Sequence, residues 1–522
     1  MTLDKYSAVG DIPYVNAQLQ PDKTAIIYND KRIKWDEFNK RINRLANWLI
    51  SHGIEKGDRV ALLFYNGNEF LETLFALLKI GAVAVPLNFR QIPEEIKWTL
   101  DNSKCIAVIY SSRLANLIQS VKSQLYGVKL YICDGDNIPE DEYSYEKICF
   151  QGNCEEPSVV INPDDWAVVI FTGGTTGTPK GAIYSHYTLL NTFRMIGLSV
   201  EEITDNDIFL NQPPLFHGGG MLHVLSYLAH GACVYLFDSM DAEQILRGIE
   251  KEKVTDIFLV PPLIFFRLVE QNKTTNADLS SITAVIGAAG ACSMPLVDAL
   301  FEIFPNGKIY IGWGCTEISG GISNVICRDT LKKYPWRLNS VGQCRAPTIL
   351  EIKIIDKSGN EVPVGEVGEA IVKSTTNFIG YLDQPELTAG KLKNGWVYTG
   401  DLMSKDKDGY FYFVDRMQNI IKSGGEKIYG TEVENALLTC PEVQEAAVIG
   451  LPDPIYSEIV CAVVKLHSGS KLTEDDLVQW CRQRISSYKK PKKIFFVDEF
   501  PRNESGKILK NVLREKYSNQ SR

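Results

Sequence analysis

Glycine, threonine and lysine gather in one short stretch whose residue types suit phosphate binding. Residues 171–186 read FTGGTTGTPKGAIYSH and follow an apolar run that is typical of a buried strand. Glycines let the backbone approach an anion closely, threonine hydroxyls donate hydrogen bonds, and the lysine adds a positive charge. We expect a polyphosphate to contact Thr172, Gly173, Gly174, Thr175, Thr176, Gly177, Thr178 and Lys180.

This stretch does not match the common phosphate-loop motifs. A P-loop needs Gly directly before its Lys and Ser or Thr directly after it, whereas Pro179 precedes Lys180 and Gly181 follows it. A kinase glycine loop is excluded because no H-R-D or D-F-G motif follows. Taken alone, the stretch is also compatible with a polar loop between a strand and a helix.

Five further motifs follow in order along the chain. They are PPLFHGGG (213–220), GWGCTE (312–317), YTGD (398–401), DRMQNIIKSGGEKIYGTEVE (415–434) and PRNESGKI (501–508). In this order the set resembles the adenylate-forming enzymes, which include acyl-CoA synthetases, firefly-type luciferases and peptide-synthetase adenylation domains. The resemblance is strongest to fatty acyl-CoA synthetases and covers nearly the whole chain, from PDKTAIIY to Lys510.

The resemblance implies an AMP-forming acid–thiol ligase that uses ATP, Mg²⁺ and coenzyme A. A carboxylate attacks the α-phosphorus of ATP to give an acyl-adenylate and pyrophosphate, and the thiol of coenzyme A then displaces AMP. A ligase that loads a carrier protein instead of coenzyme A stays open. So do a non-catalytic nucleotide-binding regulator and, more weakly, a luciferase-like oxygenase.

The resemblance also assigns the nucleotide contacts. Trp313 takes the place of the aromatic ring that lies against adenine, with Ala288, Gly314 and Thr316 beside it, and an indole face suits such stacking. Asp401 would accept hydrogen bonds from the ribose hydroxyls. Arg416 would contact ribose or phosphate. The alternatives from the residues alone are a core tryptophan, a turn aspartate and a surface ion pair.

Three residues are the candidate catalytic groups: Lys507, Glu317 and His217. Lys507 would bridge the substrate carboxylate and the α-phosphate, where a cation stabilises the approach of two anions. Outside this set of motifs it would be an ordinary solvated lysine. Glu317 would bind Mg²⁺, with Thr172 or Thr176 as a second ligand.

His217 bears on the choice of acid. Amino-acid-activating relatives carry an Asp near this place, so a His followed by three glycines disfavours an amino acid substrate. We expect His217, Met221, Val260, Gly287 and Gly312 to line an apolar acyl pocket; a buried core histidine is the alternative for His217. The sequence favours a medium- or long-chain fatty acid, and an aryl or other hydrophobic carboxylate stays open.

The second half-reaction should involve the segment after Arg416. Gln418 stands where the family usually has Asp or Lys, and Gly430 replaces a frequent Pro, so the pivot residue of the expected hinge stays open. Gly424 and Gly425 would leave room for a pantetheine arm. Four lysines between residues 489 and 493 would meet the phosphates of coenzyme A or form a solvated face.

Composition limits the remaining functions. The net charge of −9 and the pI near 5.4 argue against nucleic-acid binding. No apolar run is long enough to cross a membrane, and the first residues do not read as a secretory signal. Twelve scattered cysteines indicate free thiols in a reducing cytoplasm. The oligomeric state, including a homodimer, stays open.

The elements that must position these residues alternate between helix and strand. The helical spacing of apolar residues in 34–54 and the short apolar runs near residues 59–65, 105–111, 165–172, 232–238, 254–260 and 282–289 predict an α/β fold with largely parallel sheets. Residues 350–374 predict a strand–turn–strand unit. We expect a large domain of stacked α/β subdomains with a β-rich subdomain over 1–417, and a small mobile α+β domain over 418–522.

Overall fold

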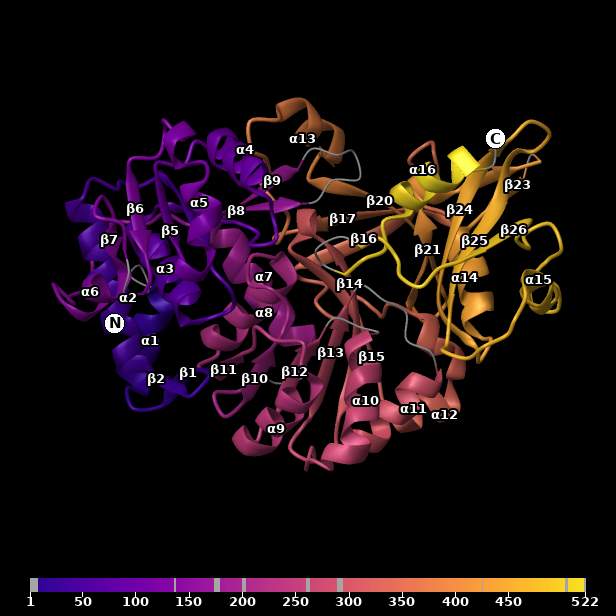
Figure 1. Ribbon diagram of the computed structural model, residues 1–522, viewed down its shortest axis with the longest axis horizontal. Coiled ribbons are helices and arrows are strands. Elements are labelled where there is room, and N and C mark those ends of the chain that lie inside the picture. Colours follow the sequence, from indigo (N-terminus) through magenta and orange to yellow (C-terminus); the bar gives the residue numbers. More distant parts are fainter. Residues whose placement is uncertain are drawn as a thin grey trace.

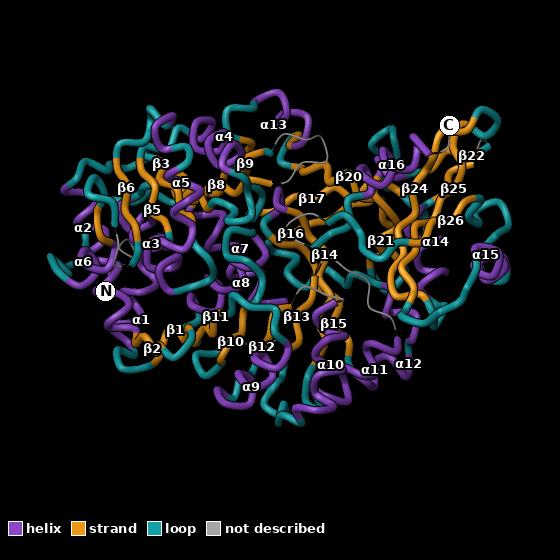
Figure 2. Tube along the Cα trace, viewed as in Figure 1, coloured by secondary structure: helices purple, strands orange, loops and turns teal. Residues whose placement is uncertain are grey.

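A computed structural model describes residues 8–135, 138–172, 179–199, 203–259, 263–288, 294–424, 426–502 and 506–520. Within these residues the fold is mixed α/β, as the alternating sequence pattern predicted. Four sheets follow one another through the molecule, and Figure 1 shows the C-terminal residues as a separate group of elements at the right of the view. Figure 2 shows the strands running through the interior with helices around them.

The first eight-stranded sheet, here sheet A, carries most of the later motifs. Its strands in spatial order are β15 (Gly320–Ile326), β14 (Lys308–Cys315), β13 (Ala284–Ala288), β12 (Asp256–Leu259), β10 (Ile208–Asn211), β11 (Cys233–Leu236), β1 (Thr24–Tyr28) and β2 (Lys31–Lys34). The inner neighbours pair in parallel, and the two edge strands β15 and β2 pair antiparallel.

The second eight-stranded sheet, sheet B, carries the glycine–threonine hairpin. Its order is β18 (Gly380–Tyr381), β9 (Lys180–Ser185), β8 (Trp166–Thr172), β4 (Val83–Pro86), β3 (Arg59–Leu63), β5 (Ala107–Tyr110), β6 (Leu130–Cys133) and β7 (Tyr143–Ser144). β9 and β18 run antiparallel to their neighbours, whereas β8 through β7 are parallel.

Helices fill three layers around these sheets. The middle layer lies between the sheets and shares one hydrophobic core with both; it contains α1 (Ile12–Leu19), α2 (Trp35–Ser51), α3 (Asn68–Ile80), α6 (Tyr145–Phe150), α7 (His186–Ser199) and α8 (Gly218–Ala229). The outer face of sheet A packs on α9 (Ala242–Glu252), α10 (Leu263–Thr275), α11 (Met294–Ile303) and α12 (Arg328–Lys333). The outer face of sheet B packs on α4 (Pro93–Ser103) and α5 (Ala115–Gln119).

Two smaller sheets complete the chain. Sheet C is antiparallel and consists of β16 (Leu350–Ile355), β17 (Gly368–Ser374), β19 (Leu392–Lys393), β20 (Trp396–Lys405) and β21 (Phe411–Arg416), with α13 (Pro385–Lys391) before β19. Sheet D consists of β22 (Ile421–Ser423), β23 (Glu426–Ile428), β24 (Val443–Asp453), β25 (Ser457–Leu466) and β26 (Lys493–Phe496), with α14 (Gly430–Leu438), α15 (Glu474–Arg482) and α16 (Lys510–Gln520).

Sheet C ends at Arg416 and sheet D begins at Ile421, with a short 3₁₀ turn over Met417–Asn419 between them. Sheet D has cores of its own on both faces. The domain boundary between residues 417 and 418 stays a prediction, and it falls inside this turn.

Candidate active site

The described ends of the glycine–threonine stretch form an antiparallel hairpin. Thr172 closes β8 opposite Lys180, which begins β9, and the Thr172 hydroxyl donates to the Lys180 carbonyl at 3.4 Å. The hairpin therefore holds Thr172 and Lys180 side by side at the mouth of the loop. The loop residues that the sequence assigned to phosphate lie outside the described residues: Gly173, Gly174, Thr175, Thr176, Gly177 and Thr178.

Tyr381 joins this hairpin to the candidate magnesium ligand. β18 pairs with β9, which places Tyr381 opposite Ala182. The Lys180 ammonium lies 5.6 Å from the centre of the Tyr381 ring, within reach of a cation–π contact. The Tyr381 hydroxyl donates to Glu317 Oε1 at 2.5 Å. Lys180 and Glu317, which are 137 positions apart, are therefore linked by one tyrosine.

Glu317 is held as an anion. It lies in a 3₁₀ turn, Thr316–Ile318, directly after β14, and the Phe378 N–H donates to its carbonyl at 3.0 Å. Burial pushes the pKa of Glu317 upward, but the Tyr381 hydroxyl and the charge of Lys391 outweigh burial and hold the pKa below its usual range. Mg²⁺ is commonly bound by one or two carboxylates together with substrate phosphates.

Glu317 therefore fits a site in which Mg²⁺ is bound by a carboxylate together with substrate phosphates. Among the described residues no cluster of three or more His, Cys, Asp or Glu side chains would hold a metal without such phosphates.

The predicted adenine and ribose contacts lie against each other. The Trp313 indole N–H donates to Asp401 Oδ2 at 2.9 Å, and both side chains are almost fully buried. Asp401 and Arg416 face each other across β20 and β21, and Arg416 Nε lies 3.3 Å from Asp401 Oδ1. Arg416 keeps about a third of its side chain exposed (36%). These contacts bring together three residues from three separate motifs.

Lys391 connects the Glu317 and Asp401 groups. Its ammonium donates to the carbonyl of Thr399, two residues before Asp401, at 2.9 Å. Its charge also contributes to the lowered pKa of Glu317. This lysine stands at the end of α13, where the sequence analysis assigned no function.

Lys507 approaches the same group from the C-terminal part of the chain. Lys507 keeps an exposed surface, but partial desolvation by the surrounding protein and then repulsion by Arg416 lower its pKa to about 8, with Asp401 acting in the opposite direction. Arg502, five positions before Lys507, pairs with Glu445 on β24, and its guanidinium donates to the Gly506 carbonyl. Lys507 is thus within electrostatic reach of the Asp401–Arg416 pair.

Asp415, next to Arg416, ties the last strand of sheet C to the first helix of sheet D. Its buried carboxylate accepts the Thr431 N–H at the start of α14 at 3.2 Å and the Arg416 N–H at 2.7 Å. A carboxylate at a helix N-terminus is favourable because the N–H groups of the first turn lack helical partners.

The described residues that the sequence assigned to the acyl pocket lie at the start of α8 and on β13 and β14. His217 is the N-terminal cap of α8, and burial and the nearby Arg90 lower its pKa. Among the described residues, a Cβ added at Gly312 would meet only the Gly287 and Ile322 carbonyls, at 3.8 and 3.9 Å. Met221 is fully buried in the core between the sheets.

The remaining pocket and nucleotide residues are placed as follows. Ala288 ends β13 opposite Gly312, and Gly287 lies opposite Ile311. Gly314 is exposed on β14, and the Thr316 carbonyl accepts the Tyr184 hydroxyl at 2.6 Å. Val260 lies outside the described residues.

The segment assigned to coenzyme A is only partly described. Gly424 adopts a positive φ of 59°, which favours glycine, and Gly425 lies outside the described residues. Of the nearby lysines, Lys489 pairs with Glu432 at 2.6 Å, and Lys492 lies over the Tyr456 ring. Both lysines therefore have protein partners in this structure.

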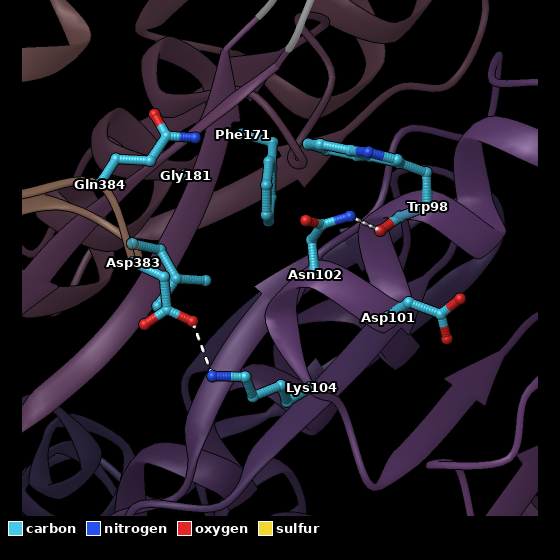
Figure 3. Close-up of a pocket in the computed structure, with 9 residues that line it drawn as sticks. Trp98, Asp101, Asn102, Lys104, Phe171, Gly181, Asp383 and Gln384 are labelled. Atoms are coloured by element: carbon cyan, nitrogen blue, oxygen red, sulfur yellow. Dashed lines mark hydrogen bonds and ion pairs between the residues drawn. The ribbon is translucent and has the colours of Figure 1, made fainter. Parts of the chain in front are cut away.

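A separate surface pocket of about 220 Å³ lies on the α4 side of the hairpin (Figure 3). Trp98 and Phe171 meet edge to face there, and Lys104 pairs with Asp383 at 2.8 Å. Phe171 directly precedes Thr172, so the pocket lies behind the strand that ends at the candidate phosphate site.

Tyr381, Lys391 and Asp415 contact the candidate site residues, and the sequence analysis did not single them out. Tyr381 stands in FIGYLD and Lys391 in TAGKLKNG, and neither stretch has a spacing that indicates chemistry. Asp415 directly precedes Arg416 in the motif DRMQNIIKSGGEKIYGTEVE. Its place beside an assigned residue was the one sequence feature that could have indicated a role in the site.

Comparison with protein families gives two matches. The family described as AMP-binding enzyme matches residues 14–382, and the family described as AMP-binding enzyme C-terminal domain matches residues 432–507. The first match alone covers more than half of the chain.

Two curated proteins illustrate the relatives. The chain is 34% identical over 513 residues to a feruloyl-CoA synthase of Amycolatopsis sp, with 98% of this chain and 99% of that protein covered. It is 33% identical to the long-chain-fatty-acid–CoA ligase FadD13 of Mycobacterium tuberculosis, with 97% and 96% covered.

Two solved structures of CoA synthetases or ligases are similar to the chain over nearly its whole length. A fatty acyl CoA synthetase of Mycobacterium tuberculosis is 29% identical with a TM-score of 0.78, covering 99% of both chains. The anthranilate CoA ligase AuaEII, solved in complex with anthranoyl-AMP, is 26% identical with a TM-score of 0.90, covering 98% of both chains.

Proposed function

Because this chain belongs to the AMP-binding enzyme family and is related to acyl- and aryl-CoA ligases, we propose that it joins a hydrophobic carboxylic acid to coenzyme A. ATP, Mg²⁺ and coenzyme A are the cofactors of these ligases. In the first step a carboxylate oxygen attacks the α-phosphorus of ATP and pyrophosphate leaves. In the second step the thiol of coenzyme A attacks the acyl carbonyl, loses its proton, and AMP leaves.

The observation that carries this proposal is the position of Lys507. Its ammonium comes from the C-terminal part of the chain and lies within electrostatic reach of Asp401 and Arg416 in sheet C. We propose that Asp401 binds the ribose and Lys507 stabilises the two anions that meet in the first step. No protein nucleophile is needed, so positioning and charge supply the catalysis.

The other groups have roles that follow from their contacts. Glu317 would hold Mg²⁺, which neutralises charge on the phosphates when bound, and Tyr381 would keep the Glu317 carboxylate aimed and ionised. Lys180 and Thr172 would face the outer phosphates. Trp313 would have to release or share its bond to Asp401 when ribose binds.

The acid itself is the finer part of the proposal. One relative is named for a feruloyl group and another for long-chain fatty acids, so relatives of similar identity differ in acid class. The apolar surroundings of α8 agree with both. The fatty acid that the sequence favours and the aryl acid that it leaves open are the two classes to compare.

Pyrophosphate release tests the proposal directly. We would measure it with ATP and Mg²⁺ across fatty and aryl acids, with and without coenzyme A. Acid-dependent release that coenzyme A accelerates supports the ligase. Acid-dependent release that is indifferent to coenzyme A indicates a different acceptor, such as a carrier protein. Absence of release with every acid would contradict the proposed chemistry.

A further inference from the structure

The short helix α13 has no role in the proposed function. It spans Pro385–Lys391, and none of its seven residues, all of them described, is buried. In Figure 1 it lies at the top of the view, between β9 and β20. Because the helix adds no buried side chain to a core, its polar contacts matter for where it lies.

Thr388 ties α13 to the phosphate side of the site. Its hydroxyl oxygen accepts the Tyr381 N–H at 2.9 Å, and the hydroxyl donates to the Gln384 carbonyl at 2.9 Å. The packing is close here, since a Cβ added at Gly380 would lie 2.8 Å from Thr388 Cγ2. The Tyr381 hydroxyl donates to Glu317, so Thr388 holds the strand that carries this tyrosine.

Lys391 ties the same helix to the ribose side of the site. Its ammonium donates to the Thr399 carbonyl at 2.9 Å. The Thr399 hydroxyl oxygen accepts the Asp401 N–H at 3.1 Å, and the hydroxyl donates to the Ala370 carbonyl at 2.6 Å. Lys391 therefore holds the residue whose side chain supports the backbone of Asp401.

These two tethers start from neighbouring positions on the helix. Thr388 and Lys391 are three positions apart, and residues at this spacing are neighbours on a helix surface. The strand that Thr388 contacts, β18, belongs to sheet B, and the strand that Lys391 contacts, β20, belongs to sheet C. One side of α13 therefore connects two sheets that each carry part of the candidate site.

We propose that Lys391 is a positioning residue that, together with Thr388, holds the phosphate-binding and ribose-binding groups at a fixed separation. The phosphate-binding group consists of Thr172, Lys180, Tyr381 and Glu317, and the ribose-binding group consists of Asp401 and Arg416. This inference rests on the proposed function, because it assumes that ATP spans the two groups.

A fixed separation favours a ligand that reaches both groups at once. Groups that are held in advance need little ordering when such a ligand binds, whereas loosely held groups must be ordered at that moment. MgATP would reach both groups, through its ribose and its outer phosphates. AMP lacks the outer phosphates, so its affinity should not depend on the separation.

Calorimetric binding of two nucleotides gives the test. The ligands are AMP and α,β-methylene-ATP with Mg²⁺, which keeps three phosphates but cannot release pyrophosphate. Lys391→Met should raise the Kd of the ATP analogue by about tenfold, the loss expected for one hydrogen bond to a charged group. The Kd of AMP should stay at its wild-type value. Lys391→Arg, which can still donate to the Thr399 carbonyl, should restore most of the affinity for the analogue.

A second variant separates positioning from direct contact with phosphate. Thr388→Val keeps the shape of the side chain and removes the acceptor of the Tyr381 N–H. It should weaken the ATP analogue selectively, as Lys391→Met does. Combining the two changes should weaken it no further than the larger single change, because releasing either tether already frees the helix. Wild-type affinity in Thr388→Val would show that Lys391 does not act through α13.

Lys393→Met is the matched control. Lys393 lies two residues after Lys391 on β19 and is exposed, and its ammonium lies 4.6 Å from the centre of the Tyr398 ring. This variant loses the same charge close to the same place but breaks neither tether. It should bind AMP and the ATP analogue as the wild type does.

The remaining outcomes separate the inference from the function beneath it. Equal losses for AMP and the ATP analogue in Lys391→Met, or no loss for either, would overturn the positioning role and leave the ligase intact. Failure of Lys391→Arg to restore the affinity would also overturn it. Absence of binding of both nucleotides to the wild-type protein would instead remove the proposed function itself.

Discussion

At the scale of single residues, charge is concentrated where two anions would have to meet. Lys507, Arg416 and Lys391 surround the carboxylates of Asp401 and Glu317, which come from different strands and turns. Opposite charges placed in advance cost no reorganisation during the reaction, which is why such groups stabilise a transition state.

Replacing Lys507 should separate the two half-reactions. Lys507→Ala should slow acyl-adenylate formation by about a hundredfold or more, because one preorganised charged contact is lost. Conversion of supplied acyl-adenylate to acyl-CoA should keep its wild-type rate. Single-turnover measurements of pyrophosphate release and of thioester formation check the two steps, and equal losses in both would rule out this assignment.

The pH dependence of the first step should follow Lys507. Because the pKa of Lys507 is lowered to about 8, its ammonium loses its proton as the pH rises through that value. The kcat/KM for adenylation, which reports the free enzyme, should therefore fall above about pH 8. In Lys507→Arg the guanidinium stays charged, so the descending limb should vanish even though the rate is lower. A limb that persists in that variant would have another origin.

At the scale of elements, the hairpin of β14 and β15 shows how glycines serve two different needs. Gly312 and Gly314 are two residues apart on β14. A Cβ at Gly314 would lie 2.0 Å from the Gly320 carbonyl oxygen on the paired strand, whereas a Cβ at Gly312 would make only ordinary contacts. Gly314 allows the strands to pair, whereas Gly312 is not required for pairing and is the one proposed to border the acid.

The two glycines should respond differently to the same substitution. Gly314→Ala should lower the free energy of unfolding by about 1–3 kcal/mol or more, because the backbone must move to relieve the overlap. Gly312→Ala should change stability little but alter kcat/KM among acids of different width. Chemical denaturation of both variants, beside an acid panel for Gly312→Ala, checks this. Equal stability of the two would show that the hairpin tolerates the added methyl group.

Elements with strong periodicity could be predicted from the sequence. The helix expected over 34–54 is α2, and the apolar runs near residues 59, 105, 165 and 232 are strands. Sheets A and B are largely parallel, as expected. Their antiparallel pairings, which involve β2, β9, β15 and β18, could not be predicted, because the alternation of side chains is the same in both directions. The eight-residue α1 was not anticipated.

The site was predictable only where a motif marked it. Trp313, Asp401 and Arg416 stand in recognisable motifs, and the structure brings them into contact. Tyr381 became visible only through the pairing of β18 with β9 and its bond to Glu317. These contacts join residues that are distant in sequence, and no single motif encodes them.

At the scale of the whole molecule, the turn over Met417–Asn419 joins sheet C to sheet D. Asp415 adds a contact between them, since it belongs to β21 and accepts an N–H from α14. Within the described residues no helix is both long and apolar enough to span a membrane.

Removing this carboxylate should loosen α14. Asp415→Ala should cost about 1 kcal/mol, the usual effect of losing a side-chain acceptor at a helix N-terminus. Faster hydrogen exchange at the first amides of α14 would report it. Asp406→Ala is the matched control, because Asp406 accepts N–H groups only within its own turn of sheet C, from Asp408 and Tyr410. Similar exchange in both variants would show that Asp415 does not support α14.

The bond between Trp313 and Asp401 gives the unlabelled protein an optical reporter. Indole emission responds to a neighbouring carboxylate and to stacking. The Trp313 indole N–H donates to the buried Asp401 carboxylate, and a bound ribose would compete for that carboxylate. Of the eight tryptophans in the chain, Trp313 is the one that nucleotide binding would perturb at this carboxylate. The emission spectrum of the wild-type protein, with Trp313→Phe as its blank, can therefore follow nucleotide arrival and departure during turnover without a dye.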